Sequence, residues 1–187
     1  MAQDEFLLLV KKFAWLVLGR LVLLVAILYL VLFIVRVVYV LESPVEVIYG
    51  EGQVLNQANI LLSGGRLYGP IDNYPYLVAP YTPLYYYLVA GLVRLFGNGL
   101  LPGRLLSVVA SLAVGGLAGL SVWEITRHRL ASLSALLVYF AFQNVWAWTP
   151  LNKGDMLALA LAMGGIYLTL RGRSPTGACP ERSEGLG

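Results

Sequence analysis

The sequence predicts an all-α integral membrane protein with about four transmembrane helices and with interfacial helices in its first external loop. Two observations predict this fold class. Hydrophobic residues make up 59% of the 187-residue chain and charged residues 12%, whereas a typical soluble domain has roughly 25% charged residues. The apolar residues also form runs that are long enough to cross about 30 Å of hydrocarbon.

The first apolar run covers residues 15 to 41 and has opposite charges at its two ends. Basic residues lie at its start and acidic residues follow it: Lys11, Lys12 and Arg20, then Glu42 and Glu46. Because cytoplasmic segments carry the excess of Lys and Arg, we predict a cytoplasmic N-terminus and an external loop after the run. The run is too long for a removable signal peptide. We expect Arg36, near its outer end, to extend to the membrane interface.

Three further spans are predicted over residues 105 to 123, 130 to 148 and 156 to 170. The first of them contains Gly115 and Gly119 at the GxxxG spacing. Small residues at this spacing let helices approach closely in lipid, so we expect tight packing there.

The segment over residues 81 to 97 is ambiguous, because it has the minimum length for a span and contains Arg94. If it crosses the membrane, six Lys and Arg residues lie on each side, with Arg36 set aside. If it lies along the outer surface, eight lie inside and four outside. The second arrangement obeys the positive-inside rule, and three consecutive tyrosines suit an interfacial helix. We therefore predict a first external loop over residues 42 to 104.

A second helix is predicted early in this loop, over residues 52 to 63. Its apolar residues recur at helical spacing (Val54, Leu55, Ala58, Leu61 and Leu62). Gly64 and Gly65 follow, as is typical of a helix end. This pattern predicts an amphipathic helix lying on the bilayer, with Glu51 at its N-terminus. Glu51 is either an ordinary helix-start acid or a functional carboxylate.

The four-span topology brings a second acid to the same membrane surface. Asp155 lies at the predicted mouth of the fourth span. In this topology it is external, as Glu51 is. Two acids more than a hundred residues apart in sequence are therefore expected at one end of the helices.

The charge distribution favours the lipid bilayer as a partner and argues against nucleic acid. The chain has a net charge of +3. Its charged residues lie between and beside the apolar runs, as the positive-inside rule requires, and do not form a patch of the kind that binds nucleic acid. We interpret His128, between two arginines, as a loop residue rather than a metal ligand. Residues 173 to 187 combine Pro, Gly, Ser and charges without periodicity, which predicts a disordered tail.

The order of several motifs resembles the N-terminal part of a GT-C superfamily glycosyltransferase, in the protein O-mannosyltransferase and aminoarabinose-transferase branch. The resemblance covers about residues 15 to 172. It rests on Glu51 after the first span and on four later segments: "LLSGGRLY" (61 to 68), "YTPLYYYLVAGLVRLFG" (81 to 97), "GRLLS" (103 to 107) and "NKGDMLALAL" (152 to 161).

This resemblance implies transfer of a sugar from a polyprenyl-phosphate carrier to an acceptor on the external face of the cell membrane. It implies that Glu51 is the general base and Asp155 a second acid. The leaving phosphate needs nearby cations, and the candidates are Lys153, Arg66 and Arg94. The resemblance leaves open whether a divalent cation is required, and the residues indicate no metal site.

The chain departs from the family pattern in two motifs and in length. The family's Asp-Glu pair is Gly50-Glu51 here, and the arginine before the second acid is Lys153. Relatives are several times longer, so we expect residues 1 to 172 to be a partial module that is inactive alone. The alternatives are a non-catalytic membrane scaffold and a small transporter subunit. The three later spans have no ionisable residue in their cores, which argues against a transporter.

Overall fold

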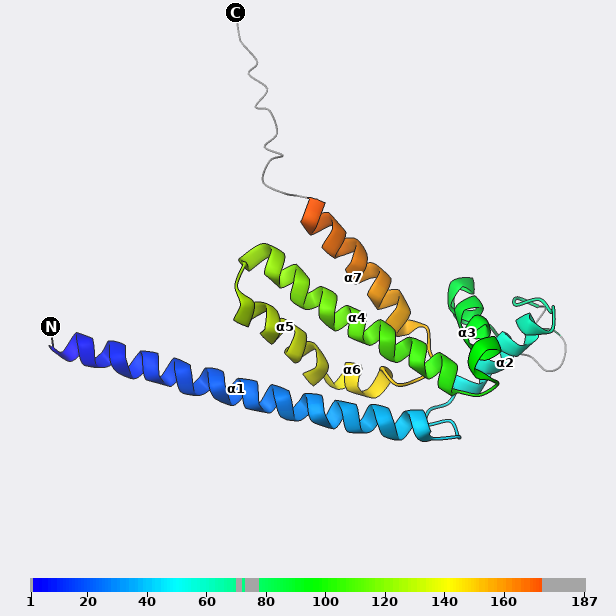
Figure 1. Ribbon diagram of the computed structural model, residues 1–187, viewed down its shortest axis with the longest axis horizontal. Helices are drawn as coiled ribbons and strands as arrows, with labels where there is room; N and C mark the ends of the chain where they lie inside the picture. The colour runs from blue at the N-terminus through cyan, green and yellow to red at the C-terminus, as the bar shows by residue number, and fades with distance from the viewer. Residues whose placement is uncertain (1, 70–71, 73–77, 173–187) are drawn as a thin grey trace, which may run out of the picture.

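The computed structural model describes residues 2–69, 72 and 78–172, and this part of the chain is all-helical (Figure 1). The predicted all-α class is therefore confirmed. The tail predicted over residues 173 to 187 lies outside the described residues. The helices, in chain order, are α1 (Ala2–Glu42), α2 (Glu51–Leu62), α3 (Pro83–Phe96), α4 (Leu101–Thr126), α5 (Arg129–Ala141), α6 (Gln143–Trp148) and α7 (Asp155–Gly172).

The long helices alternate in direction (Figure 1). The end of α1 and the starts of α4 and α7 lie together, beside α2 and α3; we call this the loop end. The turn between α4 and α5, residues 127 and 128, lies at the opposite end, which we call the turn end. Alternation places the described residues of the 42 to 104 segment and the α6–α7 connection at the same end; which side of a membrane this end faces stays a prediction.

Two of the helices are long and apolar enough to cross a membrane: α4 and the part of α1 that covers Lys11–Glu42. Their length and composition are compatible with membrane insertion. The span predicted over residues 130 to 148 is instead divided into α5 and α6, because the backbone of Phe142 is extended, with φ −68° and ψ 128°. Helix α7 occupies the place of the fourth predicted span, and its crossing of a membrane stays a prediction.

Helix α2 matches the amphipathic helix predicted from the sequence. It is followed by Ser63 and by Gly64, whose φ of +80° favours glycine. Its apolar face does not lie open to lipid, however. Val54 and Ala58 are buried in a core with aromatic and aliphatic residues of α3. The expectation that this face lies on the bilayer is replaced by a packed α2–α3 pair.

Helix α3 confirms a helix within residues 81 to 97. Pro83 begins it, where a missing backbone N–H costs nothing. Gly97 ends it with a φ of +95°. Its 14 residues extend about 21 Å, less than the hydrocarbon thickness of about 30 Å. Its position on the membrane surface stays a prediction.

The GxxxG glycines do permit close packing between α4 and α5. A Cβ atom added to Gly115 would lie 2.8 Å from the ring of Phe140, and one added to Gly119 would lie 3.1 Å from the Ser132 carbonyl oxygen. The Ser132 hydroxyl donates a 2.7 Å hydrogen bond to the Gly119 carbonyl. Phe140 also packs against Phe33 of α1, with ring centroids 4.9 Å apart. Helix α7 packs along α4.

Arg36 binds the end of α6, and its position at the membrane interface stays a prediction. Its Nε donates to the Trp146 carbonyl at 2.9 Å, and one of its terminal nitrogens donates to the Ala147 carbonyl at 3.3 Å. The guanidinium also lies 4.3 Å from the centre of the Trp146 ring. The last carbonyls of α6 have no partner within the helix, so Arg36 supplies their donors.

Candidate functional site

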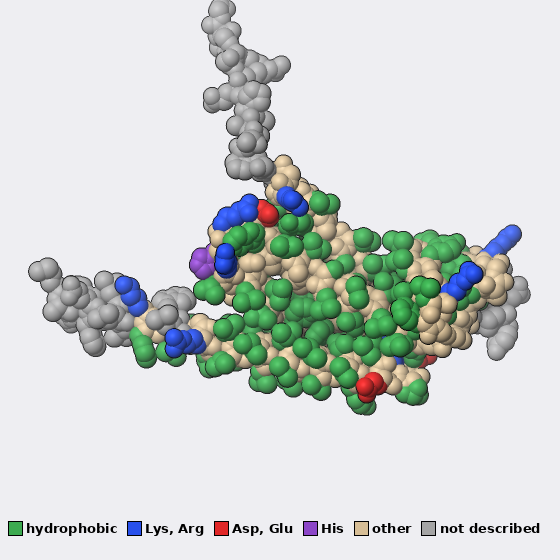
Figure 2. Space-filling view, viewed as in Figure 1, with side chains coloured by type: hydrophobic (Ala, Val, Ile, Leu, Met, Phe, Trp, Pro, Cys, Tyr) green, Lys and Arg blue, Asp and Glu red, His purple; other side chains and the backbone are tan. Residues whose placement is uncertain are grey.

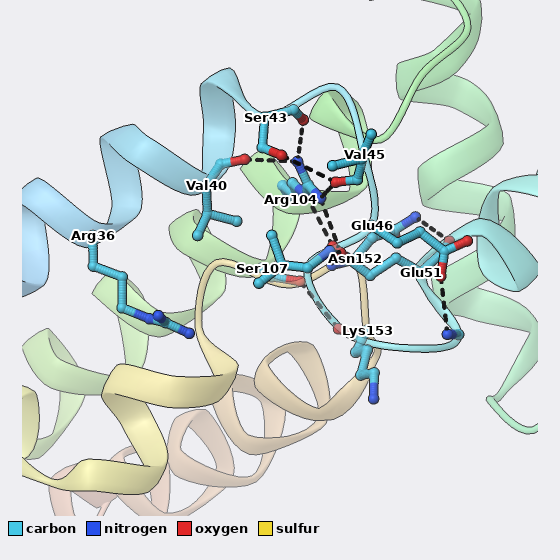
Figure 3. Close-up of polar contacts among 12 residues, drawn as sticks. Arg36, Val40, Ser43, Val45, Glu46, Glu51, Arg104, Ser107, Asn152 and Lys153 are labelled. Carbon is cyan, nitrogen blue, oxygen red and sulfur yellow. Dashed lines mark hydrogen bonds and ion pairs between the residues drawn. The ribbon is translucent and has the colours of Figure 1, made fainter.

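A buried ion pair joins the start of α2 to the first turn of α4. Arg104 donates from Nε to Glu51 Oε1 and from a terminal nitrogen to Glu51 Oε2, both at 2.9 Å. Both side chains are 0% exposed. Figure 3 shows both side chains, with their hydrogen bonds as dashed lines, where the chain after α1, the start of α4 and the chain before α7 meet. This two-point geometry is the strongest form of an arginine–carboxylate contact.

The other N–H groups of Arg104 bind the chain between α1 and α2. One terminal nitrogen donates to the carbonyls of Val40 and Ser43, each at 2.6 Å. The other donates to the Val45 carbonyl at 2.8 Å. Together with the two bonds to Glu51, all five N–H groups of the guanidinium have acceptors. Arg104 therefore fixes the exit of α1 against α4.

Glu51 is equally saturated as an acceptor. Besides Arg104, the backbone N–H of Asn152 donates to Oε1 and that of Val47 donates to Oε2, both at 2.9 Å. Burial acts to raise the pKa of Glu51, but the hydrogen bonds from Arg104 and from these backbone groups outweigh it, so the pKa lies below its ordinary value of 4.5. The carboxylate is therefore ionised and held by four donors.

Asn152 connects this pair to the chain before α7. Its side-chain amide donates to the Glu51 backbone carbonyl at 3.1 Å, in addition to the backbone contact. Gly103 permits the approach, because a Cβ there would lie 1.8 Å from Asn152 Oδ1. The glycine and arginine of the "GRLLS" motif thus have structural roles: one makes room for Asn152, and the other binds Glu51.

A tyrosine of α3 extends the network. The Tyr85 hydroxyl donates to Asn152 Oδ1 at 3.0 Å and lies 3.4 Å from the Ser107 hydroxyl. Ser107 in turn donates to the Lys153 carbonyl at 3.0 Å. Tyr85 is almost completely buried, and burial raises its pKa, so it remains a neutral donor. The "YYY" and "GRLLS" segments therefore meet around Asn152.

Asp155 differs from Glu51 in its surroundings. It is the first residue of α7 and is exposed. The Tyr81 hydroxyl lies 3.4 Å from Asp155 Oδ2. Burial, followed by the neighbouring Asp155 charge, raises the pKa of Tyr81. Tyr81 also contacts Tyr85 edge-on, with ring centroids 5.7 Å apart, so Asp155 lies at the open edge of the same network.

Both predicted acids lie at the loop end, but other residues lie between them. Within the described residues, Glu51 and Asp155 make no direct hydrogen bond. They are connected through Asn152, Tyr85 and Tyr81.

The predicted phosphate-binding cations are placed differently from one another. Lys153 belongs to the network through its backbone, and its ammonium lies 4.5 Å from the centre of the Trp148 ring. Arg66, after α2, and Arg94, in the last turn of α3, are exposed. Among the described contacts, neither touches Glu51 or Asp155.

Sequence reasoning missed Arg104 and Asn152. In the charge count, Arg104 is only one of the four basic residues on the external side, although it lies inside the "GRLLS" motif. A single arginine at the start of an apolar helix was a usable signal, because a charge there needs a partner if the helix start is buried. Nothing near Asn152 in the sequence indicates that it binds Glu51.

No group of three or more His, Cys, Asp or Glu residues suited to a metal ion occurs in the described part of the chain. Comparisons with protein-family models, with curated proteins and with solved structures found no match.

Proposed function

We propose that this chain contributes to a membrane glycosyltransferase that moves a sugar from a polyprenyl-phosphate carrier to an acceptor hydroxyl at the loop end. The observation that carries the proposal is an exposed carboxylate, Asp155, at the edge of a rigid polar network beside apolar helices. A lipid-linked donor needs this combination, since its tail lies among apolar helices and its reacting carbon lies at their polar end.

The geometry favours Asp155 over Glu51 as the general base. In the reaction, the acceptor oxygen bonds to the anomeric carbon, the bond from that carbon to the phosphate oxygen breaks, and the hydroxyl proton passes to a carboxylate. Both oxygens of Glu51 already accept two hydrogen bonds each. Asp155 is exposed, with a single hydroxyl neighbour among the described contacts.

Glu51 then serves as a positioning residue. It holds the backbone and the side chain of Asn152, and Asp155 follows three residues later. In this proposal, Glu51 and Arg104 fix the short connection from which the reacting carboxylate projects. The role of Glu51 as the base itself stays a prediction from the family resemblance.

Carrier binding tests the proposal directly. The purified chain, in nonionic micelles, is titrated with polyprenyl phosphate and with the matching polyprenol, and tryptophan fluorescence reports binding near Trp148. We expect tighter binding of the phosphate, weakened by Lys153→Gln because the cation is lost. Lys12→Gln, an exposed lysine of α1, is the matched control. Equal binding of phosphate and alcohol contradicts the proposal.

The acid is tested by transfer of sugar. Residues 42 to 158 are grafted into an active member of the family that the chain resembles. Asp155→Asn is expected to lower turnover by about 10² to 10⁴ with carrier binding retained, as loss of a general base does. Full turnover of the Asn variant contradicts the assignment of Asp155.

A membrane scaffold is the second candidate, favoured by the saturation of Glu51 and Arg104. A buried pair with every donor and acceptor used is what a structural link requires. A scaffold binds polyprenyl phosphate and polyprenol equally weakly, so the same titration separates the two functions.

A further inference from the structure

A groove runs between α4 and α5 near the turn end. It has a volume of about 390 Å³ and is open on one side. Gly116 and Gly119 form part of its α4 wall, and Leu133 and Leu136 form part of its α5 wall. The close contact between Gly119 and Ser132 fixes the separation of the two helices. The groove is therefore an apolar surface held open by backbone packing.

The mouth of this groove is basic and aromatic. Arg129 and Trp123 line the groove at this end, and Figure 2 shows basic side chains and the histidine gathered there, with one acidic side chain beside them. The two ion pairs recorded among the described residues join Glu51 to Arg104 and Glu124 to Arg127. Within that part of the chain, no carboxylate neutralises Arg129.

We propose that this groove binds one anionic phospholipid of the bilayer, with an acyl chain along the glycines and leucines and the headgroup phosphate against Arg129. The charge of Arg129 complements a phosphate, and its planar group can bind two phosphate oxygens. Trp123 beside it suits the interface depth at which headgroups lie. The inference requires that α4 spans a membrane, and it is independent of glycosyl transfer.

The turn end suits such a lipid for a second reason. Basic pockets between membrane helices on the cytoplasmic side recognise anionic headgroups, and the topology predicted from charge places residues 127 to 129 on that side. His128 does not compete for the phosphate through Nδ1, because this atom accepts a hydrogen bond from the backbone N–H of Ala131 at 3.4 Å.

The test compares two phospholipids that differ only in headgroup charge. The purified chain, in nonionic micelles, is titrated with phosphatidylglycerol or phosphatidylcholine of the same acyl chains, and bound lipid is counted by native mass spectrometry. We expect the anionic lipid to bind about fivefold more tightly, the effect of roughly one basic residue near a headgroup. Equal affinity for the two lipids overturns the proposal.

Two variants separate the headgroup contact from the acyl-chain contact. Arg129→Gln is expected to remove the preference for phosphatidylglycerol. Gly116→Leu is expected to weaken the binding of both lipids, because the added side chain fills the groove. The helices can accept this change, since a Cβ at Gly116 meets no atom within 4 Å. Circular dichroism verifies that both variants keep the helix content of the parent chain.

Matched controls make the same changes outside the groove. Arg171→Gln removes an exposed arginine from the last turn of α7, and Gly164→Leu adds a side chain where a Cβ also meets nothing within 4 Å. Both should bind phosphatidylglycerol as the parent chain does. If Arg171→Gln removes the preference as fully as Arg129→Gln, the effect is general charge attraction, and the proposed site is wrong.

Discussion

The two ends of the helical bundle use the same kind of ion pair in opposite settings. At the loop end, Glu51 and Arg104 are 0% exposed and lie 53 residues apart in sequence. At the turn end, Arg127 pairs with Glu124 one helical turn away, and their side chains are 65% and 19% exposed. The buried pair connects elements that are distant in sequence, whereas the exposed pair remains within the end of one helix.

This difference predicts different energetic roles. An exposed pair contributes about 0 to 1 kcal/mol, because water screens it and two side chains lose freedom. Removal of one partner from a buried pair costs about 3 to 5 kcal/mol, because the other charge stays in the interior without compensation. The buried pair at the loop end therefore serves the structure, whereas the exposed pair at the turn end stays accessible to solvent.

The largest expected effect comes from Arg104→Met. This change leaves the Glu51 carboxylate buried and removes the donors for three backbone carbonyls. We expect the free energy of unfolding to fall by about 3 to 5 kcal/mol, measured by SDS titration of the chain in nonionic micelles. Arg127→Gln at the turn end is the matched control and should change it by less than about 1 kcal/mol. Similar losses in both variants would show that the contrast between the ends is wrong.

A smaller effect is expected for Glu51→Gln, which keeps the shape and one carbonyl oxygen. Loss of the charge-assisted bonds to Arg104 should cost about 2 to 3 kcal/mol. The pH dependence identifies the cause. Because the folded-state pKa of Glu51 is lowered, the unfolded chain binds its proton first as the pH falls. The stability from this group is present above about pH 4.5 and is lost as the pH falls through the folded-state pKa.

Thermal unfolding between pH 7 and pH 3, followed by circular dichroism, checks this prediction. The difference in unfolding temperature between the parent chain and Glu51→Gln should shrink as the pH falls below 4.5. A difference that stays constant over this range would assign the loss to shape rather than to charge. Glu124→Gln at the turn end is the control and should shift the unfolding temperature little at any pH.

The smallest effect is expected for Gly103→Ala. The added Cβ would lie 1.8 Å from Asn152 Oδ1, so the connection before α7 must move away from Glu51. We expect a loss of about 1 to 3 kcal/mol, as is typical of overpacking, measured by the same SDS titration. Gly164→Ala lies in a helix where a Cβ meets nothing within 4 Å, and it should be neutral or slightly stabilising. Equal behaviour of the two variants would contradict the packing around Asn152.

The sequence by itself determined the helical class and the limits of α2. Hydrophobic periodicity and the glycines after residue 62 predicted α2 almost to the residue, and α3 lies within the segment predicted over residues 81 to 97. These signals are local, because a helix face repeats every three or four residues and a glycine with positive φ acts on its own turn. The convergence of Glu51 and Asp155 at one end also followed, since it depends only on alternating helix direction.

Only the tertiary structure decided which charges are paired and where a helix breaks. Three arginines and a lysine lie in residues 42 to 104 and in the α6–α7 connection: Arg66, Arg94, Arg104 and Lys153. The place of Arg104 at a helix start indicates that it needs a partner, but nothing local identifies that partner as Glu51. The partner of Glu51 is selected by burial of the α4 start against the end of α1, a contact between segments far apart in sequence. Phe142 likewise interrupts the predicted span without a neighbouring proline or glycine. Such choices depend on long-range packing, whose energies exceed local helix preferences.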